Sequence, residues 1–196
     1  MHQEQTPEKR KMISCFKGKF RVTSPRGYRT LSGKREYHKG IDLVGIDDKT
    51  VYAVADGTID ATPFEASGFG YYVRQLLPDG RRIYYAHLKK GSICVKPGQK
   101  IKAGDALGVM GATGKVTGAH THLELRPKGT GGDSVDVCEF TGLQNKVGTY
   151  SYEEKPTLDK LIKKVKTAYR FEDQTINFLK KYEYAYALFE RLAEKI

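Results

Sequence analysis

The chain has 196 residues, 39% of them hydrophobic, which fits one domain, or one domain with a small appendage, around a packed core. No apolar run approaches the roughly 18 residues that a membrane span needs, so no spanning helix is expected. The three cysteines include no CxxC pair, which argues against a disulfide framework and against a thiolate zinc site.

Residues 1–15 are predicted to form a flexible arm, and they lack the apolar stretch of a Sec-type signal peptide. The formal net charge is +11, and residues 1–45 carry eleven Lys and Arg against four Asp and Glu, so the basic excess lies at this end. Such charge suits an anionic partner, either nucleic acid or the polyanions of a bacterial cell wall. The alternative is that it serves only solubility. No recognised nucleic-acid motif accompanies the charge, so specific nucleic-acid binding is not expected.

Short strands separated by Gly and Pro-Gly turns follow the arm, and this pattern predicts an antiparallel sheet system. Residues 16–22 are the first predicted strand, residues 23–29 are rich in turn formers, residues 32–36 form a polar loop, and residues 37–44 enter a strand. Further strands are predicted at residues 51–54, 57–60, 71–77 and 81–88. The last two of these form a hairpin across the turn at residues 78–80.

The last quarter of the chain has a different pattern. Residues 128–132 are a Gly-rich connector, and residues 141–156 are expected to be a linker. From residue 157 apolar residues recur at helical spacing in two runs, which predicts a hairpin of two helices over residues 157–196. The runs are Leu158, Leu161, Ile162, Val165 and Tyr169, and then Phe178, Tyr182, Ala185, Phe189, Leu192 and Ile196. This hairpin either packs on the β domain or on itself, or it binds the cell wall or drives oligomerisation.

Histidines gather in the β region, where four of the five lie between residues 38 and 122. In a strand, positions i and i+2 point to one face, so His120 and His122 place two imidazoles side by side. His38 and Asp42 share a face of a strand over residues 38–44, and a twist or bulge at Gly40 can bring them to one point.

These residues match the needs of a catalytic zinc site, which usually has three protein ligands and a water in the open position. His38, Asp42 and one member of the final pair can serve as ligands. The other member and His87 remain, one to accept a proton and one to stabilise an oxyanion. Each motif alone is usually a coincidence, but the combination is specific and suffices to hydrolyse an amide.

Longer stretches of sequence surround these residues: SPRGYR at 24–29, HKGID at 38–42, VADGTI at 54–59, YAHL at 85–88, VKPGQKI at 95–101, GVMGATG at 108–114 and TGAHTHLE at 117–124. Together they resemble the lysostaphin/LytM-type zinc endopeptidases of bacterial cell walls. The resemblance covers roughly residues 20–127, and no metal or catalytic position is missing.

The resemblance implies one Zn2+ per chain, held by His38, Asp42 and His122. It implies two catalytic histidines that do not bind the metal, His87 and His120, without deciding which of them is the base.

The resemblance also implies a mainly β fold for a domain spanning residues 16–140, with an antiparallel LytM-like core of the duplicated hybrid or barrel-sandwich type and the helical segment after it. A groove over the zinc would be walled by loops near residues 24–37, 62–70 and 112–118. Tyr28, Tyr37 and Tyr71 are candidates for binding substrate in that groove.

By this resemblance the substrate is peptidoglycan, cut in its stem peptides or cross-bridges, with anionic wall polymers as further candidate partners. A basic enzyme of this type without a signal peptide suggests a phage-encoded lysin, or a virion-associated hydrolase, that acts on the host wall. The alternative is a secreted bacterial autolysin whose export segment was trimmed. The sequence leaves the oligomeric state open.

Two other functions compete with this interpretation. An inactive family member would act as a binding or activating module, but such proteins lose metal ligands and this chain keeps all of them. Residues 95–105 also resemble the turn pattern of biotinyl and lipoyl carriers and of a phosphotransferase domain that uses a phosphorylated histidine. Neither would require both the HxxxD and the HxH motif.

Overall fold

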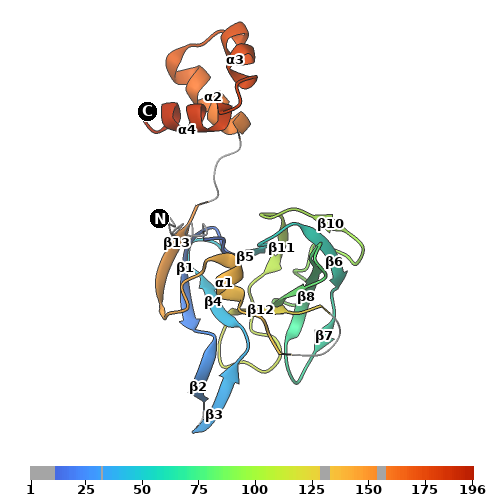
Figure 1. Cartoon of the computed structure of the whole chain (residues 1–196). Helices are drawn as coiled ribbons and strands as arrows, with labels where there is room; N and C mark the ends of the chain where they lie inside the picture. Colours follow the sequence, from blue (N-terminus) through green and yellow to red (C-terminus); the bar gives the residue numbers. More distant parts are fainter. Residues whose placement is uncertain (1–11, 32, 129–132, 154–157) are drawn as a thin grey trace, which may run out of the picture. The chain divides into compact units, whose positions relative to one another are not determined.

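The computed structural model describes residues 12–31, 33–128, 133–153 and 158–196. These residues belong to two compact units, a β unit that ends at Glu153 and a helical unit that follows it (Figure 1). Across the described ranges, no helix is both long enough and apolar enough to cross a membrane.

The β unit is built on one antiparallel sheet of nine strands, as predicted for a mainly β fold. Eight strands follow one another in the order β10 (Lys100–Ile101), β6 (Gly57–Ala61), β8 (Gly70–Leu76), β9 (Arg82–Leu88), β12 (Thr121–Arg126), β4 (Ile41–Gly45), β1 (Gly18–Ser24) and β13 (Gly148–Tyr152). The ninth, β7 (Phe64–Glu65), pairs with β8 alone. The predicted hairpin across residues 78–80 is present as β8 and β9.

Two smaller sheets complete the β unit. One pairs β11 (Ala106–Val109) with β5 (Thr50–Tyr52), and the other is a hairpin of β2 (Gly27–Leu31) and β3 (Lys34–His38). This hairpin projects from the body of the unit (Figure 1). The predicted strands near residues 51–54 and 57–60 therefore exist, but they lie in different sheets.

The central strands β4 and β12 show why the sheet can carry a polar site. Leu43 and Leu123 are fully buried in the apolar core, and the residues next to them, Asp42 and His122, are buried as well. Because neighbouring residues of a strand point to opposite faces, one face of these strands supplies the core and the other supplies polar side chains.

Two predictions about the β unit were wrong in part. Residues 34–36, predicted as a polar loop, lie in β3, and the strand expected over residues 38–44 is interrupted at residues 39–40. The hairpin escaped prediction because the β3 side chains before His38 are all exposed, so its sequence shows no buried alternation.

The ends of the β unit also differ from the prediction. Residues 1–11 of the expected flexible arm lie outside the described residues, but Ser14 and Cys15 are buried, and Ile13 donates a backbone hydrogen bond to Thr141. The expected linker over residues 141–156 contains β13, which pairs with β1. Strand β13 follows the short helix α1 (Val137–Thr141), whose N-cap residue Asp136 accepts hydrogen bonds from two backbone amides. The connector at residues 129–132 lies outside the described residues.

Within its described residues, 158–196, the helical unit contains three helices, α2 (Leu158–Tyr169), α3 (Asp173–Lys180) and α4 (Ala185–Ala193). The prediction of a two-helix hairpin was wrong, because the second apolar run is divided between α3 and α4. Two residues of that run, Phe178 and Tyr182, are exposed. The unit has its own core of Leu161, Ile162, Val165, Ile176, Ala185, Phe189 and Ala193.

Candidate metal and catalytic site

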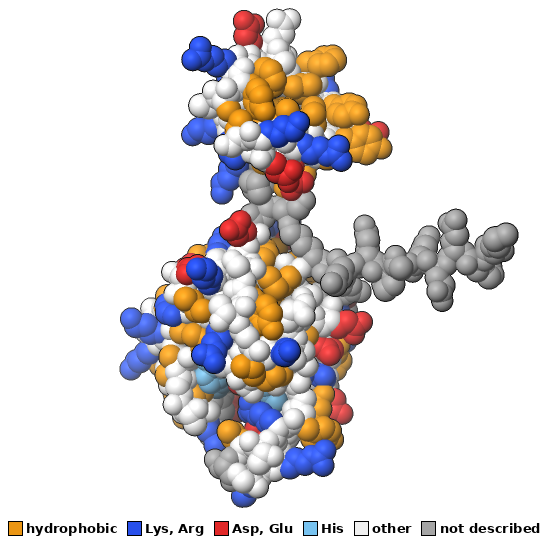
Figure 2. Space-filling view, turned by 90° about the vertical axis from the view of Figure 1, so that its left-hand side faces the viewer, with side chains coloured by type: hydrophobic (Ala, Val, Ile, Leu, Met, Phe, Trp, Pro, Cys, Tyr) orange, Lys and Arg blue, Asp and Glu red, His pale blue; other side chains and the backbone are white. Residues whose placement is uncertain are grey.

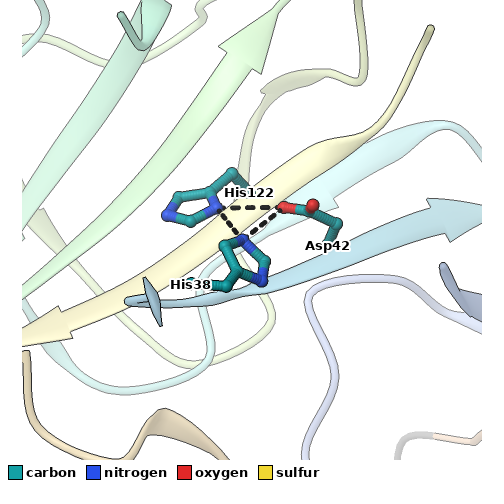
Figure 3. A group of neighbouring side chains, drawn as sticks. All are labelled: His38, Asp42 and His122. Atoms are coloured by element: carbon teal, nitrogen blue, oxygen red, sulfur yellow. Dashed lines mark hydrogen bonds and ion pairs between the residues drawn. The ribbon is translucent and has the colours of Figure 1, made fainter. Parts of the chain in front are cut away.

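Three buried side chains meet where β3, β4 and β12 come together: His38, Asp42 and His122 (Figure 3). The His38 Nε2 atom lies 3.0 Å from His122 Nδ1 and 3.1 Å from Asp42 Oδ1. The His122 Nδ1 atom lies 2.9 Å from the same Asp42 oxygen. The structure therefore brings the three predicted ligand residues together at one point.

Strand pairing and one glycine account for this meeting. Asp42 of β4 lies directly opposite His122 of β12, and the interruption between β3 and β4 at residues 39–40 places His38 at the same point. A Cβ atom at Gly40 would lie 2.4 Å from the Leu123 carbonyl oxygen and 2.7 Å from the His122 ring. Only glycine permits this close approach, so Gly40 lets the His38 segment approach β12.

Each of the three side chains has a partner on the side away from the meeting point. The His38 Nδ1–H donates to the Pro25 carbonyl at 2.8 Å, and the His122 Nε2–H donates to Glu124 Oε2 at 3.0 Å. The second oxygen of Asp42, Oδ2, lies 3.3 Å from an Arg29 nitrogen. Since a carbonyl and a carboxylate only accept hydrogen bonds, these contacts fix which ring nitrogens carry hydrogen.

The donor set fits a zinc ion. With the outer nitrogens protonated, neutral His38 and His122 turn lone pairs toward the Asp42 oxygen, and three such acceptors would repel one another without a cation. Tetrahedral zinc with bonds of about 2.0–2.1 Å places its ligand atoms roughly 3.3 Å apart, close to the observed separations. Outer partners of this kind are typical of histidine and carboxylate metal ligands.

The electrostatics of the group also favour a positive charge. Burial alone would raise the pKa of Asp42, but hydrogen bonds and charge from His122 and His38 hold that pKa well below its ordinary value. Burial lowers the pKa of His122, whereas Asp42 and Glu124 raise it, and the net shift is upward. A proton on His122 or a metal ion can supply this charge, and metal binding displaces the proton.

The other two predicted histidines lie beside this group. The His87 and His120 rings are 4.7 Å apart between centroids, and the His120 Nε2 atom lies 3.6 Å from Asp42 Oδ1. The Nδ1–H of His87 donates to the Thr113 carbonyl, and that of His120 donates to the Gly118 carbonyl, both at 2.9 Å. The Nε2 atom of His87 is therefore left to interact with a substrate, whereas that of His120 faces Asp42.

The backbone of His87 explains its position. In a regular strand His87 would point to the same face as Tyr85, whose side chain is fully buried in the core. Instead His87 has φ = 63°, a left-handed conformation that is unfavourable for a non-glycine residue, and the pairing of β8 with β9 shifts register nearby. Burial lowers the pKa of His87 to about 4, so its imidazole is neutral at pH 7.

Two of the three loops predicted to wall a groove pack against each other beside His87. The backbone N–H of His87 donates to the Phe69 carbonyl, and the backbone N–H of Lys115 donates to the Gly68 carbonyl. Thr113 accepts a further bond from the Tyr71 amide. In Figure 2, histidine side chains are visible at a hollow in the surface of the β unit.

The three tyrosines proposed to bind substrate have different surroundings. Tyr28 and Tyr37 form an edge-to-face pair on the β2–β3 hairpin, with centroids 5.0 Å apart, and both are exposed. Tyr71 packs on Phe64, with centroids 4.5 Å apart. Their contact with substrate stays a prediction.

Sequence reasoning missed Glu124, Arg29 and Phe69. Glu124 follows His122 by two residues, so strand periodicity could have placed it on the same face. Phe69 stacks on the His122 ring, with centroids 5.6 Å apart. Arg29 and Phe69 lie in segments predicted to wall the groove, but the sequence pattern did not indicate that their side chains contact the site residues.

Comparison with known proteins agrees with this geometry. Residues 36–136 match the model of Peptidase family M23. Peptidoglycan DD-endopeptidase ShyC of Vibrio cholerae is 30% identical over 107 residues, which are 54% of this chain and 24% of that protein. The chain spans about a quarter of the length of the curated relatives that it matches.

Solved structures show the same fold. The catalytic domain of the prophage-encoded M23 protein EnpA from Enterococcus faecalis, solved as a point mutant, is 33% identical with a TM-score of 0.52, covering 60% of this chain and 88% of that one. The catalytic domain of lysostaphin from Staphylococcus simulans is 25% identical with a TM-score of 0.54, covering 63% and 92%. The family match covers half of the chain and contains all five histidine and aspartate residues of the site, and we conclude that the chain belongs to Peptidase family M23, with the LytM/lysostaphin-like fold.

Proposed function

We propose that this protein is a zinc-dependent endopeptidase that hydrolyses peptide bonds in bacterial peptidoglycan. The observation that carries the proposal is the meeting of His38, Asp42 and His122, with their outer hydrogen bonds in place and two further histidines beside them. The peptidoglycan substrate is supported by the name of the relative ShyC.

In this proposal His38, Asp42 and His122 hold one zinc ion. When bound, zinc polarises a carbonyl group and lowers the pKa of water to about 7. The remaining steps fall to residues of the chain that touch the substrate.

His87 suits the role of proton acceptor, because it is neutral at pH 7 and its Nδ1–H is engaged by Thr113, which leaves Nε2 to take a proton from the attacking water. It can then return this proton to the amine that leaves. His120 lies next to His87 and suits stabilisation of the oxyanion, which requires a proton on its Nε2.

The proposal also places the cleaved bond in a stem peptide or a cross-bridge of peptidoglycan. A phage source also stays a prediction, and its support is the prophage-encoded EnpA among the similar structures.

Digestion of purified walls tests the proposal. Gram-positive and Gram-negative peptidoglycan would be incubated with the full chain, with and without a chelator, and the released fragments analysed by mass. New peptide amino termini that disappear with chelator and return with zinc are expected, and their masses name the bond. Zinc binding at one per chain without release from any wall would instead favour an inactive binding or activating module.

A further inference from the structure

A single arginine on the projecting hairpin contacts the cluster of His38, Asp42 and His122, called the metal group below. Arg29 of β2 directs Nη1 at two atoms, the Ser24 hydroxyl at 2.7 Å and Asp42 Oδ2 at 3.3 Å. Its Nε and Nη2 atoms both lie 2.7 Å from Glu36 Oε1 on the paired strand β3. One guanidinium therefore joins the hairpin to a predicted metal ligand.

The two oxygens of Asp42 have separate partners. Oδ1 faces the ring nitrogens of His38 and His122, and Oδ2 faces Arg29. A carboxylate with both oxygens free can bind a cation through one oxygen or through both. With Oδ2 engaged by a cationic side chain, only Oδ1 is available on the side of the histidines.

We infer that Arg29 is a positioning residue that holds Asp42 as a one-oxygen metal ligand and couples the β2–β3 hairpin to the metal group. The inference rests on the proposed zinc site. Arg29 is suited to this task because its planar guanidinium reaches three partners in fixed directions, which the single ammonium of lysine cannot do.

The geometry also explains why the contact is more than hairpin stabilisation. The Glu36 and Ser24 contacts alone would hold the Arg29 side chain along the hairpin. The additional approach to Oδ2 places positive charge behind a buried carboxylate whose other partners are histidines. Removing it would leave Oδ2 free to turn toward the cation and would change the number of bonds in the site.

The test measures zinc and cobalt binding by the full chain, with no substrate present. Arg29→Met keeps an unbranched apolar stem and removes the guanidinium with its charge, and Arg29→Lys keeps the charge. Glu36→Gln removes the outer ion pair and leaves the Asp42 contact. Arg21→Met, at an exposed position of β1, is the matched control. Zinc dissociation constants come from competition with a chromophoric chelator, and circular dichroism of the metal-free proteins checks folding.

The expected result is that Arg29→Met weakens zinc binding about 10- to 100-fold. Arg29→Lys should fall between Arg29→Met and the wild type, while Glu36→Gln and Arg21→Met stay within about threefold of it. In the cobalt-loaded proteins, the visible absorption of Arg29→Met should weaken, because cobalt with more than four ligands absorbs less than tetrahedral cobalt. Should Arg29→Met fail to fold, the same comparison is made between Arg29→Lys and Glu36→Gln.

Wild-type zinc affinity and cobalt spectrum in a folded Arg29→Met protein would overturn the inference and leave the proposed function standing. Equal weakening by Glu36→Gln and Arg29→Met would also overturn it, since the effect would then belong to the hairpin as a whole. A wild-type chain that binds neither metal would overturn the proposed function itself.

Discussion

The metal group has two unlike sides. On one side Glu124, 2% exposed, holds His122 from within the central sheet, and its other oxygen accepts a hydrogen bond from Arg126 at 2.7 Å. On the other side Asp42 is held by Arg29, whose side chain is 29% exposed on a hairpin that projects from the unit. The sheet side is thus fixed by burial and strand pairing, whereas the hairpin side depends on a few polar contacts. We expect rigidity from the first and adjustment to substrate from the second.

Replacing the ligand on the sheet side should have the largest effect. His122→Ala removes one of the three proposed metal ligands and is expected to abolish zinc binding and peptide hydrolysis. His87→Ala and His120→Ala should retain the metal and lose most turnover, about 100-fold or more for a lost proton-transfer group. Metal content and hydrolysis rates of the three proteins check this. Loss of zinc from His120→Ala together with its retention in His122→Ala would reverse the ligand assignment.

Changing the buried carboxylate tests the sheet side without touching a ligand. Glu124→Gln removes the negative charge and replaces one of the two acceptor oxygens with an amide nitrogen, so the His122 and Arg126 donors can no longer each have an acceptor, and zinc affinity should fall about 10- to 100-fold. Thermal stability should fall by more than in Arg29→Met, because the Glu124 contacts are more deeply buried. Chelator competition and thermal unfolding measure the two effects, with Glu153→Gln as the exposed control. A larger loss of stability in Arg29→Met would contradict the distinction between the two sides.

Removing the metal should show directly whether the hairpin side is held less firmly than the sheet side. Zinc at about 100 times its dissociation constant stabilises the folded chain by about 2.7 kcal/mol, and a chelator removes this contribution. Amide hydrogen exchange should then accelerate most in the hairpin, at residues 27–38, and least in β12. Equal acceleration in both segments would mean that the hairpin is as firmly held as the sheet.

Substitution of the exposed tyrosines on the β2–β3 hairpin should have the smallest effect on zinc binding and catalysis. Tyr28→Ala combined with Tyr37→Ala removes an exposed aromatic pair whose rings contact each other and the Arg35 and Arg26 side chains, so zinc affinity should stay unchanged. If this pair binds substrate, KM for soluble wall fragments should rise about five- to tenfold, in line with an aromatic contact of about 1 kcal/mol. Tyr71→Phe, on β8 opposite Leu88, is a useful comparison. An unchanged KM would remove both hairpin tyrosines from the substrate site.

The sequence predicted this molecule best where one face of a strand is apolar. The β8–β9 hairpin and the shared face of His120 and His122 follow from two-residue periodicity and turn chemistry, and both are found in the structure. The same periodicity would have turned His87 toward the core beside Tyr85. Its left-handed backbone directs it to the site instead, and this depends on the packing of residues 68–70 and 113–115, which no local pattern encodes.

Other features escaped prediction because their side chains are polar or their partners lie far away in the chain. Strands β2 and β3 have mostly exposed side chains, so nothing in their sequence distinguished a hairpin from a loop. Strand β13 looked like a linker because its pairing partner, β1, lies more than 100 residues earlier. Arg29 was part of a stretch that the resemblance singled out, but its contact with Asp42 depends on the hairpin and could not be predicted before the hairpin was known.

The pairing of β13 with β1 has a consequence for how the β unit can be handled. Gly18 at the start of β1 lies opposite Tyr152 at the end of β13, so the chain enters and leaves the nine-stranded sheet at one corner. Units with adjacent ends tolerate circular permutation and insertion into other proteins. The ends could be joined by a short linker and new ones opened at the turn of residues 78–80, or the whole unit could be placed in a surface loop of a carrier. Either rearrangement leaves the strands that hold His38, Asp42 and His122 uncut.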